Sequence, residues 1–277
     1  SVKGKGYYIS KTDLTIKAKV LFLINKLSTY KMRIFNSFVN SLDANTHVDL
    51  DIYHCEPLVF SNIIENKKNL YDYYVIMPHF KNENLQHMGC TDDILKAIHS
   101  IPNGKLIIMD RNLKSLSKEA GRVYQDFTED IYNALTEGLE KLSKYKKVIL
   151  VYPNKGVYPY PKGIVTGFKR FCIQHDMDYE ILDEIYDSME LQLGDLYIII
   201  EESDLVNLVK QSRDRHYKLG EDIGIISYND TPLKELLGIT VISTDFKKMG
   251  EEAAKMIVDN KRVEIKNDFN VIDRHSV

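Results

Sequence analysis

The chain lacks tryptophan and has only three cysteines among its 277 residues. Cys55, Cys90 and Cys172 are widely spaced and odd in number, which argues against a disulfide framework and a zinc site and favours a reducing compartment. No run approaches the roughly 18 uninterrupted apolar residues that a membrane-spanning helix needs. We therefore expect a cytoplasmic protein with no metal, no cofactor and no membrane partner.

The chain also lacks a strong excess of charge of either sign. Its formal net charge is -3, and 28% of its residues are charged. The net charge of the chain as a whole therefore does not indicate a nucleic-acid-binding protein. The hydrophobic fraction of 44% is that of an ordinary folded protein, and the length suits one large or two small domains.

Motifs for nucleotide binding and for common hydrolytic chemistry are missing as well. There is no G-x-x-x-x-G-K-S/T phosphate loop, and Asn25 to Ser28 stand where a dinucleotide-binding fold has its glycines. The sequence contains no G-x-S-x-G, H-E-x-x-H or C-x-x-C pattern. These absences favour a binding protein over an enzyme.

What the sequence does contain is an alternation of strand-like and helix-like segments that occurs twice. Residues 20–24 form a continuous apolar run, as expected for a parallel strand covered on both faces. The other expected strands are 50–53, 73–77, 106–109, 148–151, 179–182, 196–200 and 223–226. The expected helices are 30–42, 58–64, 94–98, 131–142, 165–172, 204–210 with Asp204 as N-cap, and 246–257.

This double alternation predicts an α/β protein with two doubly wound parallel-sheet lobes. Ligands bind parallel sheets at the carboxyl ends of the strands, where loops and helix N-termini converge. Polar residues occupy several of these expected ends: His79, Asp110, Arg111, Glu201, Glu202, Asn229 and Asp230. Two lobes that face each other would form one cleft lined by such residues.

Several segments resemble the effector domain of LacI/GalR-type regulators, which has a periplasmic-binding-protein-like type I fold. Residues 221–257 read EDIGIISYNDTPLKELLGITVISTDFKKMGEEAAKMI. They are similar to the closing part of that domain, where a strand ends in a Gly-aromatic-Asp-Asp turn and a later helix reads Met-Gly-x-x-Ala. The segments IIMDRN, GIVTGFKRF and IIIEESDLVNLV are similar to three further motifs of the family. Ile164 stands where the sugar-gripping Arg is usual, and Lys162 lies nearby as a substitute.

The resemblance implies two lobes joined by crossover segments. The N-terminal lobe would comprise residues 11–124 plus 246–262, and the C-terminal lobe residues 125–245 plus 263–277. Residues 1–10, SVKGKGYYIS, resemble the last strand of a GntR-type winged helix followed by a linker, although a frayed basic terminus is the other interpretation.

A winged helix at this position would place Lys3 and Lys5 near DNA phosphates. The resemblance therefore implies operator DNA as a partner, bound through a missing N-terminal head. It also implies a homodimer, because DNA half-sites are paired.

The expected strand ends offer the planar polar groups and aromatic faces that sugars need. The expected ligand-binding residues are Tyr30, Lys31, His79, Phe80, Asp110, Arg111, Asp126, Tyr158, Lys162, Glu201, Glu202, Asn229 and Asp230. Structural alternatives exist: Tyr30 is equally suited to a helix core, and Asp126 to a charge at a helix N-terminus. Asn229 matches the sugar-binding Asp of the family.

The implied function is that of a ligand-sensing domain of a bacterial transcriptional regulator. A small neutral sugar, a pentose or deoxyhexose such as arabinose or fucose, would bind between the lobes and change DNA affinity through lobe closure. One alternative is a sugar-binding solute-binding protein of a transporter, which shares the two-lobe fold. Another is an enzyme that uses Glu201 and Glu202 as acid and base.

Overall fold

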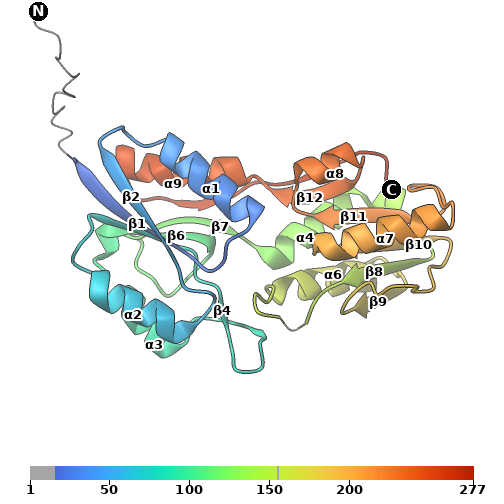
Figure 1. Ribbon diagram of the computed structural model, residues 1–277, viewed down its shortest axis with the longest axis horizontal. Helices are drawn as coiled ribbons and strands as arrows, with labels where there is room; N and C mark the ends of the chain where they lie inside the picture. The colour runs from blue at the N-terminus through green and yellow to red at the C-terminus, as the bar shows by residue number, and fades with distance from the viewer. Residues whose placement is uncertain (1–15, 155) are drawn as a thin grey trace, which may run out of the picture.

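The computed structural model describes residues 16–154 and 156–277, which form two α/β lobes (Figure 1). Each lobe has a six-stranded, mostly parallel sheet with helices on both faces. This arrangement confirms the predicted fold class. Lys3 and Lys5, the expected DNA-contacting residues, lie outside the described residues.

The sheet of the first lobe has the strand order β13-β7-β6-β3-β1-β2. Its strands are β1 (Ala18–Ile24), β2 (Thr46–Ile52), β3 (Tyr73–Ile76), β6 (Leu106–Arg111), β7 (Gly121–Gln125) and β13 (Glu264–Lys266). One face is covered by α1 (Thr29–Asn40) and α9 (Phe246–Val258), and the other by α2 (Pro57–Lys67) and α3 (Asp92–His99). A hairpin of β4 (Phe80–Lys81) and β5 (His87–Met88) projects from this lobe (Figure 1).

The sheet of the second lobe has the order β14-β12-β11-β10-β8-β9. Its strands are β8 (Lys147–Val151), β9 (Tyr179–Leu182), β10 (Asp195–Ile199), β11 (Gly224–Tyr228), β12 (Thr240–Thr244) and the antiparallel β14 (Phe269–Ile272). Helices α4 (Phe127–Glu137), α5 (Leu139–Leu142) and α6 (Gly163–Gln174) pack on one face, and α7 (Glu202–Asp214) packs on the other. The short α8 (Pro232–Leu236) connects β11 to β12.

Local sequence explains most of these elements. The apolar run of β1 is fully buried between the two helical layers of its lobe, and Ser28 caps α1 by accepting a hydrogen bond from the backbone of Lys31. The predicted N-cap at Asp204 is wrong, because α7 begins at Glu202. The Asp204 carboxylate instead accepts a hydrogen bond from the backbone N–H of Ile185 at 2.8 Å.

Close approach of α4 and α6 depends on a glycine. A Cβ built at Gly167 would lie 2.2 Å from the backbone oxygen of Thr128, so the two helices could not cross here with any other residue. The same close crossing brings Gly163, the first residue of α6, against Thr128. The N-terminal ends of α4 and α6 therefore lie side by side at the edge of the second lobe.

The chain passes between the lobes three times, after β7, after β12 and between β13 and β14. Asn267, which is 2% exposed, ties the three crossing segments together. Its backbone N–H donates to the carbonyl of Tyr124 at 2.8 Å. Its side-chain amide donates to Thr244 Oγ1 and to the carbonyl of Asp245, both at 2.9 Å.

Pairing at the edge of the first sheet departs from the sequence prediction. The resemblance implies that residues 263–277 belong to the C-terminal lobe, but β13 pairs with β7 in parallel, and so residues 264–266 lie in the first sheet. Strands β7, β12 and β14 and the β4–β5 hairpin are also absent from the sequence prediction, because they lack long apolar runs or are very short. Across the described ranges, no helix combines the length and the apolar character needed to cross a membrane.

Candidate functional site

A pocket between the lobes collects residues from the carboxyl ends of both sheets. From the first lobe it is lined by Asn25, Lys26, Tyr30, Lys31, His79, Asp110, Gln125 and Phe246. From the second lobe it is lined by Phe127, Pro159, Tyr160, Pro161, Ile164, Tyr228 and Asn229. The lining thus combines amides, hydroxyls and charged groups with several aromatic rings.

Two of the polar residues at the strand ends have left-handed backbone conformations. The φ angle is 71° at Asp110, at the end of β6, and 65° at Asn229, just after β11. Asp and Asn tolerate this conformation better than other side chains. Backbone strain of this kind clusters at functional sites, and here it occurs at both walls of the same pocket.

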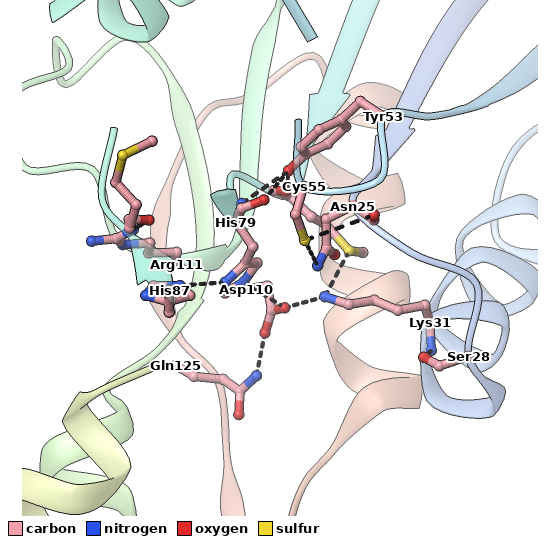
Figure 2. Close-up of polar contacts among 12 residues, drawn as sticks. Asn25, Ser28, Lys31, Tyr53, Cys55, His79, His87, Asp110, Arg111 and Gln125 are labelled. Carbon is pink, nitrogen blue, oxygen red and sulfur yellow. Dashed lines mark hydrogen bonds and ion pairs between the residues drawn. The ribbon is translucent and has the colours of Figure 1, made fainter. Parts of the chain in front are cut away.

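Asp110 is the centre of a buried polar network (Figure 2). One carboxylate oxygen accepts hydrogen bonds from Lys31 Nζ and, at 2.9 Å, from His79 Nε2, and the other accepts from the Gln125 amide. Because an ionised carboxylate can only accept, His79 carries its proton on Nε2. His79 Nδ1 then accepts from His87 Nε2, which lies 3.4 Å away.

Burial and charge set the protonation states in this network. Burial raises the pKa of Asp110, but the Lys31 ammonium and His79 outweigh it and hold that pKa well below its usual range. Burial lowers the pKa of His79 despite the nearby Asp110 carboxylate. Burial also lowers the pKa of His87 to about 3, and positive charge on Arg111 and Lys162 acts in the same direction. Near neutral pH the network therefore holds an ionised Asp110 and two uncharged imidazoles.

Lys26 stands among three tyrosines. Its ammonium lies 4.8 Å from the ring centroid of Tyr160, 5.6 Å from that of Tyr158 and 5.8 Å from that of Tyr30. Burial lowers its pKa, and the ring faces compensate part of the lost hydration. Tyr30 also stacks on Phe246, with 5.1 Å between the ring centroids. The pocket therefore has a flat aromatic wall beside a cation.

Two buried polar atoms of the pocket have no hydrogen-bond partner in the described part of the chain. They are Oδ1 of Asn25, in the first lobe, and the hydroxyl of Tyr228, in the second. Both residues are 4% exposed. A buried polar atom without a partner costs about 1–3 kcal/mol. An acceptor on one wall and a hydroxyl on the other are therefore available to a polar ligand.

The two lobes contact each other around the pocket through residues 152–154 and 156–162, which follow β8. Tyr158 OH lies 2.9 Å from His54 Nδ1, and the Gly156 N–H donates to the carbonyl of Leu85 at 3.1 Å. The free space left in the pocket is about 50 Å³, which is room for a few waters. Entry of a sugar-sized ligand therefore requires these contacts to open.

The structure brings five of the thirteen expected ligand-binding residues together in this pocket: Tyr30, Lys31, His79, Asp110 and Asn229. Three others, Arg111, Asp126 and Lys162, line a second hollow that shares Gln125, Phe127 and Pro161 with the first.

The remaining five lie elsewhere. Phe80 is fully buried and packs against Tyr53 and Phe60 in the core of the first lobe. Tyr158 contacts His54 across the rim of the pocket. Asp230 pairs with Arg274 at 2.8 Å.

Glu201 and Glu202 also lie outside the pocket. Glu201 lines a separate acidic hollow with Asp183, Glu184 and Asp204. Glu202 is exposed and accepts a hydrogen bond from the Thr231 hydroxyl at 3.2 Å. Within the described ranges, no group of three or more His, Cys, Asp or Glu side chains is placed to hold a metal ion.

Ten lining residues are not among the thirteen expected ones: Asn25, Lys26, Gln125, Phe127, Pro159, Tyr160, Pro161, Ile164, Tyr228 and Phe246. Asn25 and Lys26 directly follow β1, so the strand-end rule applied to that strand would have identified them. Gln125 ends β7, which has no apolar run to reveal it. Phe127 and Phe246 follow two of the crossings between the lobes, which the expected strands alone do not locate.

The fold is similar to those of several solved transcription regulators. The trehalose repressor from Escherichia coli is 13% identical, with a TM-score of 0.71 over 92% of this chain and 99% of that one. A LacI family transcriptional regulator from Lactobacillus casei with bound sucrose is 12% identical, with a TM-score of 0.72 over 94% of this chain and 99% of that one.

The transcriptional regulator CelR in complex with cellobiose is also similar, with 13% identity and a TM-score of 0.67 over 94% of this chain and 84% of that one. Neither a protein-family model nor a curated protein matches the sequence. At these identities the likeness shows a shared two-lobe fold.

Proposed function

We propose that this chain is the sugar-sensing domain of a bacterial transcriptional regulator and that a small neutral sugar binds between its lobes. The observation that carries the proposal is the interlobe pocket, in which Asn25 Oδ1 and the Tyr228 hydroxyl are buried on opposite walls with no partner among the described residues. A sugar presents hydroxyls that both donate and accept, together with an apolar ring face. Those hydroxyls match Asn25 and Tyr228, and the ring face matches the aromatic wall.

The balance of charge in the pocket supports a neutral ligand. Asp110, the carboxylate of the lining, is already bound to Lys31, His79 and Gln125. Lys26 lies against tyrosine rings, and burial lowers its pKa. An uncharged polyol such as a pentose or a deoxyhexose meets these groups without adding an unpaired charge to a buried site.

Placement of the pocket supports gating by the ligand. Contacts to Asn25 in one lobe and Tyr228 in the other would favour the closed arrangement over the open one. Closure turns one lobe against the other about the three crossing segments. In a homodimer with two N-terminal winged-helix heads of the GntR type, this rotation would change the spacing of the heads and hence operator affinity. A coupling of about 1–3 kcal/mol is sufficient.

Similar solved structures also support this proposal. Two regulators with the same fold are described in complex with sucrose and with cellobiose. We infer the same class of ligand for this chain and a smaller member of it, because the pocket leaves little free space.

Isothermal titration calorimetry tests the proposal. The chain is titrated with single monosaccharides, including arabinose, xylose, ribose, fucose, rhamnose and glucose. We expect at least one to bind, and we expect the Asn25→Ala variant to bind the same sugar at least about fivefold more weakly, as loss of one hydrogen bond implies. The matched control is Asn133→Ala, an exposed site on α4. Absence of heat with every sugar would refute the proposal.

A solute-binding protein of a transporter remains the second candidate, because it uses the same fold to hold the same ligands. A mobility-shift assay with the natural full-length protein separates the two. Sugar-dependent binding to DNA from its own promoter supports the regulator, and sugar binding without any DNA binding supports the transport protein. Recovery of the sugar unchanged after incubation supports binding over enzymatic turnover.

A further inference from the structure

A second hollow of about 520 Å³ adjoins the sugar pocket on the far side of Gln125, Phe127 and Pro161. Its lining includes three cationic side chains from both lobes. Arg111 ends β6 and Lys114 follows it in the first lobe, and Lys162 precedes α6 in the second. The lining therefore differs in charge from that of the sugar pocket, where the cations lie against a carboxylate or aromatic rings.

These three cations have no neutralising partner among the described residues. None of them forms an ion pair with any residue in the ranges that the structure covers. Within residues 16–154 and 156–277, the one hydrogen bond of the Arg111 guanidinium is long, 3.5 Å to the carbonyl of Met88. Most of its N–H donors therefore remain available, in the planar arrangement that pairs with oxyanions.

The start of α6 adds donors on the opposite wall. Helix α6 has 12 residues, and its N-cap position is Lys162, whose side chain makes no capping hydrogen bond. A lysine at this end is unfavourable for the helix, because the N-terminus already carries partial positive charge. In the first turn, the amides of Ile164 and Thr166 already donate to the carbonyls of Pro161 and Lys162. An anion bound here would relieve that repulsion and accept a hydrogen bond from the N–H of Gly163, which lines the hollow.

One carboxylate also lines the hollow, and its hydrogen bonds are directed elsewhere. Asp126 caps α4 by accepting from the backbone N–H groups of Thr128 and Glu129, at 3.3 and 3.2 Å. The hollow is therefore lined by three cations and by one carboxylate that already accepts hydrogen bonds from the backbone of α4. His87 is uncharged, since burial and neighbouring positive charge, including that of Arg111, lower its pKa. The hollow keeps a surplus of positive charge.

We propose that this hollow is an anion-binding site for a phosphate group, held by Arg111 and Lys114 from the first lobe and by Lys162 and the start of α6 from the second. A tetrahedral dianion has enough acceptor oxygens to engage donors on both walls at once. Since the two walls belong to different lobes, a bound phosphate stabilises their closed arrangement. Phosphate bound here would favour the closed lobes independently of any ligand in the sugar pocket. This proposal therefore does not rest on sugar binding.

Calorimetry with inorganic phosphate tests this site at constant ionic strength, with chloride as the reference anion. We expect saturable binding with a Kd of about 1 mM or lower. The Arg111→Gln and Lys162→Gln variants should each weaken it at least about tenfold, as expected for loss of a charge-assisted hydrogen bond. Lys169→Gln is the matched control, because Lys169 is an exposed lysine of α6 outside the hollow and should leave the Kd unchanged.

Parallel titrations with glucose 6-phosphate and with glucose distinguish two sources of the phosphate group. Preference for the ester, lost in Arg111→Gln, assigns the hollow to the phosphate of a sugar phosphate that reaches from the sugar pocket. Equal affinity for the ester and for inorganic phosphate assigns it to free phosphate.

No phosphate binding, or binding that both variants retain, overturns the proposal. Monosaccharide binding without phosphate binding would refute this site alone, and the reverse result would refute the proposed sugar site alone.

Discussion

Replacing Tyr228 with phenylalanine should separate stability from ligand binding. The Tyr228 hydroxyl is buried, and nothing in the described part of the chain pairs with it. Burial also raises the pKa of this phenol well above its usual value, so the group stays protonated. The Tyr228→Phe substitution removes one oxygen and leaves the ring, whose centroid lies 5.6 Å from that of the Phe269 ring.

The expected gain follows from the cost of leaving a buried hydroxyl unpaired, about 1–3 kcal/mol. Taking the lower end, Tyr228→Phe should raise the free energy of unfolding by about 1 kcal/mol, or the Tm by roughly 2–4 °C for a chain of this size. If a sugar hydroxyl pairs with Tyr228, the same variant should bind that sugar roughly 5- to 12-fold more weakly, because a net hydrogen bond contributes about 1–1.5 kcal/mol.

Tyr74→Phe is the matched control. Its hydroxyl donates to the carbonyl of Lys67 at 2.8 Å in the first lobe, away from the pocket lining. This variant should lose about 1 kcal/mol of stability and keep its sugar affinity. Differential scanning calorimetry gives the Tm, and isothermal titration calorimetry gives the Kd. A Tm loss in Tyr228→Phe equal to that in Tyr74→Phe would show that the Tyr228 hydroxyl has a protein partner. Unchanged sugar affinity would remove Tyr228 from the site.

Three further predictions concern buried polar groups. Asp110→Asn should weaken the dependence of the free energy of unfolding on pH at acid pH. The pKa of Asp110 in the folded protein is depressed below its unfolded value of about 3.9, so the stabilisation from its carboxylate is present above that pH and is lost as the pH falls below it. Thermal unfolding of both proteins across this range checks the slope, and an identical slope contradicts the account. Burial lowers the pKa of Lys234 to about 8. Between about pH 8 and the unfolded pKa of about 10.4, the unfolded chain binds more protons at this lysine than the folded chain does, so the free energy of unfolding of the unsubstituted protein should rise with pH relative to that of Lys234→Met. Urea titrations at several pH values measure this, and a difference that falls with pH would be the wrong sign. Asn267→Ala should cost about 2 kcal/mol in urea unfolding, because its amide joins Thr244 and Asp245, whereas the exposed Asn133→Ala should cost little.

The fold was largely predictable because its central strands are buried on both faces. Residues 20–24 and 196–200 are continuous apolar runs, and the structure places both in interior strands, with a paired strand on each side. Strands without such a run were not predictable in this way. β7 reads GRVYQ, and its Arg122 is buried because the guanidinium donates to the carbonyls of Leu116 and Ser117. Such tertiary hydrogen bonds leave no periodic signal in the sequence.

The site was predicted only in part, because a strand end gives the neighbourhood of a residue but not its direction. Asn229 and Asp230 are adjacent after β11, yet Asn229 lines the pocket and Asp230 pairs with Arg274. Glu201 is the N-cap of α7 and Glu202 its first residue. This helix packs on the sheet face opposite α4 and α6, so both glutamates lie away from the pocket. Direction depends on which face the next helix covers, and packing between distant segments decides that.

Repeated passage between the lobes has a consequence for synthesis on the ribosome. The core of the first lobe needs α9, which supplies Met249 and Ala253, and the second sheet needs β14 at its edge. Both elements come from the last 32 residues of the chain. A nascent chain that stops before residue 246 leaves the apolar surface under α9 uncovered and the edge of β12 unpaired, so neither half can finish folding early. Premature termination products should consequently be recognised by chaperones or proteases instead of accumulating as independent, partly active lobes.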